Sequence, residues 1–257
     1  MKINTWMIAA SLLLGSAMSH GAFAFSIPAT AQAQAASKLA HIQLKAAQGQ
    51  AEAQYLLGLM YVSGRFVAQD TLLGPQWLIR AAEQGHLKAV QTIADLSFDG
   101  KLIDKDLAQA ERWYQQLAAQ GDTRATFRLG FIYASGGHGV VRNCGKAVDY
   151  FLAVGDNVAL GNASWILATC PESEYRNGDK AMAIAKGLVA ANNQDPTHLD
   201  NLAAAYAEIG DFNAAVNIQQ QAIHALKQMA DQHRFDEFQL RLQHYQQQKP
   251  YRETLPL

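Results

Sequence analysis

The chain has 257 residues, 49% of them hydrophobic and 17% charged, which is enough apolar material for a sizeable core and excludes a disordered chain. Its formal net charge of -1 lacks the basic excess of proteins that bind nucleic acid. We therefore expect no nucleic-acid partner.

Residues 1–24 differ from the rest of the chain. Lys2 provides a positive start, the apolar run WMIAASLLLGSAM follows, and Ala22 and Ala24 occupy the A-x-A positions of a cleavage site. The run is too short to span a membrane, and no later stretch reaches about 18 uninterrupted apolar residues. This pattern predicts a signal peptide cleaved after Ala24, and a periplasmic or secreted protein with no integral membrane segment. An uncleaved anchor is the alternative interpretation.

Residues 25–37, with the sequence FSIPATAQAQAAS, are rich in Ala, Gln and Ser and contain a proline. We interpret this segment as a flexible lead-in. Regular structure is expected to begin near Lys38, where KLAHIQLKAAQGQ has the pattern of the second half of a repeat unit and would cap the first full copy.

A pattern of small and apolar residues recurs along residues 51–158. In successive copies 36 residues apart, the recurring positions hold Ala53, Leu57, Gly58, Tyr61 and Gly64, then Ala89, Ile93, Ala94, Ser97 and Gly100, then Ala125, Leu129, Gly130, Tyr133 and Gly136. A fixed period of about 20–50 residues is the signature of stacked supersecondary units. The copies at 51–86, 87–122 and 123–158 each contain two apolar-periodic segments around a glycine-bearing loop, which predicts a helix hairpin.

Two sets of residues in the copies have a structural explanation. A bulky side chain at the crossing of two antiparallel helices would hold the backbones apart, so we expect small residues there, at Gly58, Ala94 and Gly130. A short oxygen-bearing side chain before a helix accepts hydrogen bonds from unpaired backbone N–H groups. We expect this capping role, rather than a catalytic one, for Asp70, Asp106 and Asn143.

The repeated residues resemble Sel-one-like repeats (SLR), which are relatives of the tetratricopeptide repeat. The family pattern is met in the first copy by Leu57, Gly58, Tyr61, Gly64, Val67, Asp70 and Trp77. Downstream, LDNLAAAYAEIGDFNAAVNIQQQAI is similar to a tetratricopeptide hairpin, and WILATCPESEYRNGDKAMAIAKGLV is similar to a variant unit of exported bacterial tetratricopeptide proteins.

This resemblance implies an all-α fold, an α-solenoid of stacked antiparallel helix hairpins. Sel-one-like repeats with an N-terminal half-repeat cap would occupy residues 38–158, and tetratricopeptide-like hairpins residues 159–228. A capping helix and tail would occupy residues 229–257, with Phe238, Leu240 and Tyr245 covering the last hairpin.

The two cysteines, Cys144 and Cys170, lie in a chain that we expect to reach an oxidising compartment. Stacked units would bring them close enough to form a disulfide. The alternative is that both stay unpaired and pack as small hydrophobic residues.

No catalytic or metal-binding motif is present in the sequence. It lacks two His four residues apart around a Glu, a G-x-S-x-G elbow, a P-loop and a dinucleotide-binding fingerprint. We therefore predict no catalytic residue, no metal ligand and no cofactor.

The concave side of such a solenoid is the surface that these families use for protein or peptide partners. By the tetratricopeptide pattern, the groove positions are Tyr55, Leu59, Gln91, Asp95, Arg124, Phe127, Arg128 and Phe131. Arg124 and Arg128 lie one helical turn apart and could hold a carboxylate in a forked contact beside aromatic anchors. Solvated surface arginines are the alternative.

These observations favour a non-enzymatic exported adaptor that binds a protein or peptide in the concave groove. Two alternatives stay open. One is a permanent structural subunit of a cell-envelope assembly, and the other is an envelope enzyme of cell-wall or beta-lactam chemistry.

Overall fold

The structure is a computed structural model that describes residues 30–228 and 234–253. Its helices are α1 (Ala31–Ala47), α2 (Ala51–Ser63), α3 (Leu73–Glu83), α4 (Leu87–Asp99), α5 (Leu107–Ala118), α6 (Thr123–Ser135), α7 (Cys144–Val154), α8 (Asn157–Thr169), the short 3-10 helix η1 (Ser173–Tyr175), α9 (Gly178–Ala191), α10 (Pro196–Glu208), α11 (Phe212–Gln228) and α12 (Phe235–Gln246). The prediction of an all-α fold is confirmed for these residues.

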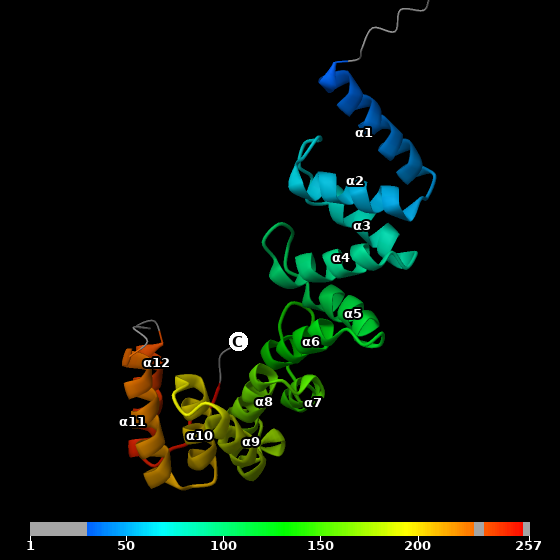
Figure 1. The fold of residues 1–257 in the computed structure, drawn as a ribbon. Coiled ribbons are helices and arrows are strands. Elements are labelled where there is room, and N and C mark those ends of the chain that lie inside the picture. The colour runs from blue at the N-terminus through cyan, green and yellow to red at the C-terminus, as the bar shows by residue number, and fades with distance from the viewer. Residues whose placement is uncertain (1–29, 229–233, 254–257) are drawn as a thin grey trace, which may run out of the picture.

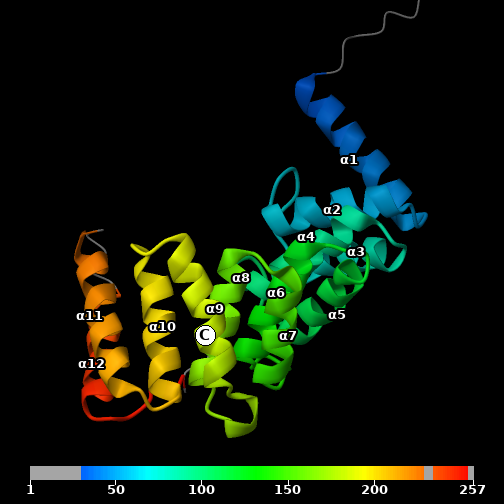
Figure 2. The same ribbon diagram turned by 60° about the horizontal axis from the view of Figure 1, so that its bottom comes forward.

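The α-helices form an arc of stacked hairpins. Each α-helix packs on the next one along the chain, and α8 also packs on α10. In Figure 1 the even-numbered helices from α2 to α10 follow the inner side of the arc, and Figure 2 shows the same succession from another side. The hairpins α2–α3, α4–α5 and α6–α7 correspond to the three predicted copies. The α-solenoid prediction is therefore confirmed.

Small residues allow the close approach of the paired helices. A side-chain carbon added at Gly58 of α2 would lie 2.7 Å from the Leu78 side chain on α3. One added at Gly130 of α6 would lie 2.7 Å from the Phe151 ring on α7. Ala94, in the equivalent place on α4, is fully buried. The sequence therefore places these residues correctly, because any larger side chain at Gly58 or Gly130 would overlap the partner helix.

The predicted helix caps are also found. Asp106 accepts a hydrogen bond from the backbone N–H of Gln109 at 2.9 Å, and Asn143 accepts one from Lys146 at 2.8 Å. Asp70 accepts one from Leu73, the first residue of α3, at 2.8 Å. These side chains satisfy N–H groups that have no partner within the helix.

The beginning of α1 differs from the prediction. We expected a flexible lead-in up to residue 37, yet α1 starts at Ala31, so the prediction is wrong for residues 31–37. Two causes are local: Ala and Gln favour helices, and the Thr30 hydroxyl accepts a hydrogen bond from the Ala33 N–H at 3.2 Å. The predicted signal peptide, residues 1–24, and residues 25–29 lie outside the described residues. None of the described helices is long and apolar enough to cross a membrane.

Helix α12 closes the C-terminal end of the stack. Phe238 and Tyr245 are buried, as predicted. The prediction is wrong for Leu240, which is 46% exposed, because it faces away from α11 and Leu242 takes the buried position instead. Residues 229–233 and 254–257 of the predicted capping helix and tail lie outside the described residues.

A disulfide joins the third hairpin to the next one. It links Cys144, the first residue of α7, to Cys170, which follows the last residue of α8. The structure thus selects the paired state from the two states that the sequence left open. On the chain-entropy model, closing a loop across a separation of 26 residues stabilises the fold by about 3 kcal/mol.

Candidate functional site

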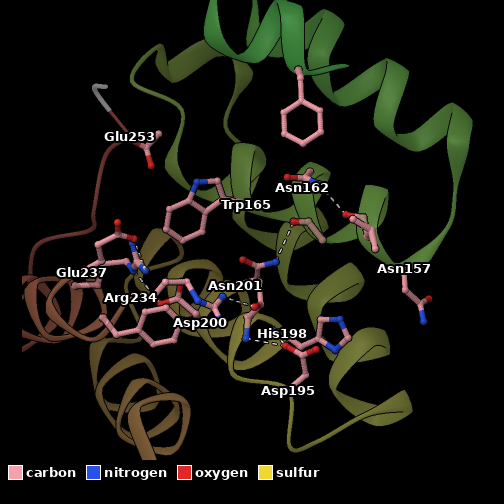
Figure 3. Close-up of a pocket in the computed structure, with 16 residues that line it drawn as sticks. Asn157, Asn162, Trp165, Asp195, His198, Asp200, Asn201, Arg234, Glu237 and Glu253 are labelled. Atoms are coloured by element: carbon pink, nitrogen blue, oxygen red, sulfur yellow. Dashed lines mark hydrogen bonds and ion pairs between the residues drawn. The ribbon is translucent and has the colours of Figure 1, made fainter. Parts of the chain in front are cut away.

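A cavity of about 480 Å³ lies on the inner side of the arc, framed by α8, α10 and α12. Helix α6 adds Phe131 to its wall, and the segment after α12 adds Glu253. Figure 3 shows side chains from these elements converging on one space, with Trp165 and Asn201 near its centre. A concave space with an aromatic ring and a few polar groups is the usual form of a binding site.

Two capping aspartates mark the starts of α8 and α10, which line this cavity. The carboxylates of Asp156 and Asp195 each accept a hydrogen bond from a backbone N–H at the start of their own helix, at 2.8 Å. Asn162 and Asn201 are the sixth residues after these caps, and both line the cavity. The helix starts therefore place corresponding side chains on the inner surface.

A buried ion pair forms the floor of the cavity. Asp200 Oδ1 accepts hydrogen bonds from Arg241 Nε at 2.9 Å and from Gln219 Nε2 at 2.7 Å. Asp200 is 4% exposed and Arg241 is 6% exposed. Burial raises the pKa of Asp200, and the nearby Arg241 guanidinium opposes that rise. Removing one member of such a pair leaves the other charged and buried, which is strongly destabilising.

Aromatic rings surround the Arg241 guanidinium. Its carbon lies 5.0 Å from the centre of the Trp165 ring, 4.8 Å from Phe238 and 5.7 Å from Tyr251. Cation–π attraction strengthens when the groups are shielded from water. The contact with Arg241 fixes the position of the Trp165 side chain, and part of its ring lines the cavity.

The walls are polar and carry more negative than positive charge. Asn201 Nδ2 donates to the Gly161 carbonyl at 3.0 Å and fastens α10 to α8. Arg234 donates to the Thr197 hydroxyl at 2.9 Å. The ionisable groups on the walls and floor are the carboxylates of Asp195, Asp200, Glu237 and Glu253 and the guanidiniums of Arg234 and Arg241. With His198 neutral, the cavity has a net negative formal charge.

The comparisons with known proteins concern the first three hairpins and the overall fold. Residues 51–86, 93–122 and 123–153 match the Sel1 repeat family. The chain therefore contains Sel1 repeats. These Sel1 repeats coincide with α2–α7, whereas α8, α10 and α12, which frame the cavity, follow the matched residues. No curated protein sequence matches the chain.

Two solved structures are similar to this protein. A Sel1 repeat protein from Oxalobacter formigenes is 23% identical, with a TM-score of 0.56 and coverage of 77% of this chain and 58% of its own. A protective antigen of uropathogenic Escherichia coli with an SLR fold is 23% identical, with a TM-score of 0.45 and coverage of 77% of this chain and 44% of its own. The chain thus spans 58% and 44% of the lengths of these proteins. The first likeness is one of fold.

In the first two Sel1 repeats, the predicted groove residues contact their neighbours. Tyr55 stacks on His86 with the ring centres 4.7 Å apart, and Leu59 packs against the core. Gln91 is half-buried on α4. Asp95 accepts a hydrogen bond from the Tyr114 hydroxyl at 2.6 Å.

The two predicted clamp arginines of the third Sel1 repeat both have partners. Arg124 Nη2 lies 2.5 Å from Asp95 Oδ1, and Asp95 raises the pKa of Arg124 through this hydrogen bond. The Arg128 guanidinium carbon lies 4.6 Å from the centre of the Phe98 ring. A carboxylate ligand would have to compete with Asp95 for Arg124, so the structure does not bring the two arginines together as a free fork.

The predicted aromatic anchors form a cluster with the core. Phe127 and Phe131 lie with their ring centres 5.0 Å apart, and each contacts Phe151, at 5.5 and 5.2 Å. Phe131 also lines the cavity. It is the residue that connects the predicted groove of the Sel1 repeats to the cavity further along the chain.

Sequence analysis missed the other cavity residues, although a signal for them exists. Trp165 is the ninth residue after its cap Asp156, as Phe131 is after Asp122. Counting from the capping aspartates rather than with the 36-residue period would have extended the predicted groove to Trp165 and Asn162.

The cysteines come close to a third possible metal ligand, Glu172, in the described part of the chain. Their sulfurs are joined in the disulfide, and the Glu172 carboxylate lies 2.9 Å from the Cys170 sulfur. A disulfide offers no thiolate to a metal, so this cluster in its oxidised state is not a metal site.

Proposed function

We propose that this protein is a non-enzymatic adaptor that is exported to the periplasm or secreted, and that it binds a protein or peptide on its concave face. The observation that carries the proposal is the cavity between α8, α10 and α12, where the partly exposed Trp165 stands among amide and carboxylate side chains. Aromatic side chains in preformed hollows are the residues that contribute most to protein binding energy.

Two further features support the proposal. The disulfide between Cys144 and Cys170 suits an oxidising compartment, as does the signal-like pattern of residues 1–24. The best-buried carboxylate at the cavity, Asp200, is held by Arg241 and Gln219, and this engagement in the fold supports a role in recognition.

Site-specific photo-crosslinking in cells tests this function. Val158 lines the cavity and is 64% exposed, so a photoreactive residue there would touch a partner in the groove. Ala183 is exposed on α9 and is the matched control. We expect a defined partner at position 158 and not at position 183.

Purified components complete the test. Trp165→Ala should weaken binding of that partner by about tenfold or more, because a central aromatic contact is lost. The partner should be recovered with unchanged mass, as expected for an adaptor. Equal crosslinking at both positions, or a partner that is cleaved or modified, would overturn the proposal.

A further inference from the structure

The segment after α12 runs back across the solenoid in an extended form. A turn at Gln248 ends α12, and the Lys249 N–H donates to the His244 carbonyl at 3.0 Å. Beyond this turn, Tyr251 lies between His244 of α12 and Trp165 of α8, and Arg252 and Glu253 contact α8 and α10. Figures 1 and 2 show this segment passing from α12 across α10 toward α8. We refer to residues 249–253 as the tail.

The side chain of Arg252 is held at the C-terminal ends of two helices. Its Nη2 lies 2.6 Å from Glu208 Oε2 on α10, in an ion pair without hydrogen-bond alignment. Its Nη1 donates to the Ala168 carbonyl of α8 at 3.2 Å. A carboxylate and a helix-end carbonyl together suit a guanidinium, which presents several N–H donors in one plane.

Glu208 is oriented by groups that do not belong to the tail. Arg176 Nε donates to Glu208 Oε1 at 2.9 Å, and Arg176 Nη1 donates to the carbonyls of Cys170 and Pro171, each at 2.9 Å. The Glu208 side chain is 14% exposed and the Arg176 side chain 17% exposed. The pocket for the guanidinium is therefore built by α8, α10 and the loop between α8 and α9.

The backbone of the next residue is bound on both sides. The Glu253 N–H donates to the Thr169 carbonyl at 2.9 Å, and the Glu253 carbonyl accepts a hydrogen bond from Arg142 Nη2 at 2.9 Å. Arg142 lies 111 residues away in the sequence, in the loop before α7. Such main-chain contacts do not depend on which side chain follows the arginine.

We propose that this surface, made by Arg142, Ala168, Thr169, Arg176 and Glu208, is a binding site for an extended peptide segment that carries an arginine, and that the tail occupies it in cis. A partner segment would place its arginine against Glu208 and its next residue between Thr169 and Arg142. Because Glu253 lines the cavity, such a segment would lead directly into it. The inference deepens the proposed function, on which it rests, by specifying the chemistry of the partner.

The tail belongs to the same chain as the binding site, and this explains how it would regulate a partner's access to that site. A tethered segment competes at an effective concentration in the millimolar range, so only a partner that also uses the cavity would displace it efficiently. Arg252 is 27% exposed, so an incoming segment can reach the contact from solvent. Weakening the tail should consequently open the site to a peptide supplied in trans.

The test uses the full chain and a fluorescein-labelled peptide with the sequence of residues 248–253, QKPYRE, followed by fluorescence anisotropy. Arg252→Ala weakens the tail, and Glu253→Pro does so independently by removing the N–H that binds Thr169. We expect both variants to bind the peptide about tenfold to a hundredfold more tightly than the unchanged chain, because only the competing tail loses contacts: the Arg252 ion pair and its hydrogen bond to Ala168 in one variant, and the Glu253 N–H bond to Thr169 in the other.

Two controls make the result specific. Adding Glu208→Gln to the Arg252→Ala variant should abolish the gain, and a peptide with Ala in place of Arg should not bind. Folded Arg252→Ala and Glu253→Pro variants, checked by circular dichroism, that bind neither peptide would overturn the proposal. So would tail exchange between two copies, seen as a concentration-dependent dimer in size-exclusion chromatography. Crosslinking at position 158 is unaffected by these outcomes, so the proposed function and this inference can fail separately.

Discussion

The Sel1 repeats of α2–α7 and the hairpins of α8–α12 share one architecture but differ in where the charged pairs lie on their inner face. In the repeats, inner-face charges pair between neighbouring helices, as in the contact of Arg124 with Asp95. In the later hairpins, the comparable pair of Arg241 with Asp200 lies beneath a cavity. The comparison shows that an ion pair of the same kind is exposed in the Sel1 repeats and buried beneath a cavity in the later hairpins.

The two ion pairs also differ in their surroundings. The Arg124 and Asp95 side chains are 53% and 31% exposed, whereas those of Arg241 and Asp200 are 7% and 6% exposed. Water screens the first pair and not the second. The same chemistry should therefore have a small effect on stability in one region and a large effect in the other.

The largest expected effect on the free energy of unfolding tests this difference between the two regions directly. Asp200→Ala should lower the free energy of unfolding by about 3–5 kcal/mol, because it leaves the Arg241 guanidinium buried without its partner. Arg124→Ala removes the exposed pair of the Sel1 repeats while leaving the Tyr114–Asp95 hydrogen bond in place, and should lower it by about 1 kcal/mol or less. Urea denaturation followed by circular dichroism measures both, and equal losses would contradict the difference between the regions.

The disulfide lies where the two regions meet, so removing it tests how firmly they are joined. Reduction should lower the free energy of unfolding by about 3 kcal/mol, as expected from the longer loop released in the unfolded chain. Urea titrations with and without dithiothreitol provide the measurement. The double variant Cys144→Ser, Cys170→Ser is the control: it should be as unstable as the reduced protein and insensitive to the reductant.

Two glycine substitutions sharpen the comparison at the level of packing. Gly130→Ala in the third Sel1 repeat should destabilise by about 1–3 kcal/mol, because the new carbon overlaps the buried Phe151 ring. Gly187→Ala on α9 meets no atom within 4 Å and should stabilise by about 0.5–1 kcal/mol through helix propensity. Thermal melting distinguishes the opposite signs, and a neutral Gly130→Ala would show that this crossing is loosely packed.

The stacking could be predicted from the sequence because its determinants are local and periodic. Gly58 and Gly130 recur at a multiple of the repeat length, and the capping side chains of Asp106 and Asn143 mark where the second helices begin. The glycines contact the partner helix of the same hairpin and the caps bind the helix that they begin, so a single period is enough to find them.

The cavity could not be predicted in the same way, because distant segments build it. The caps Asp156 and Asp195 are separated by a longer interval than the repeat, which breaks the period before α10. The contact of Arg142 with Glu253 joins residues 111 positions apart. Arg124 and Asp95 were both identified as groove residues, yet their pairing with each other depends on side-chain geometry that the spacing alone does not specify.

The position of Glu253 in the cavity wall has a practical consequence for anyone who produces this protein. An affinity tag, fluorescent fusion or sensor-chip linkage placed directly after Glu253 would begin at the proposed recognition surface. Such a product could look well behaved in purification and still give misleading affinities. Attachment through an exposed position on α9, such as Gly187, would leave that surface unobstructed.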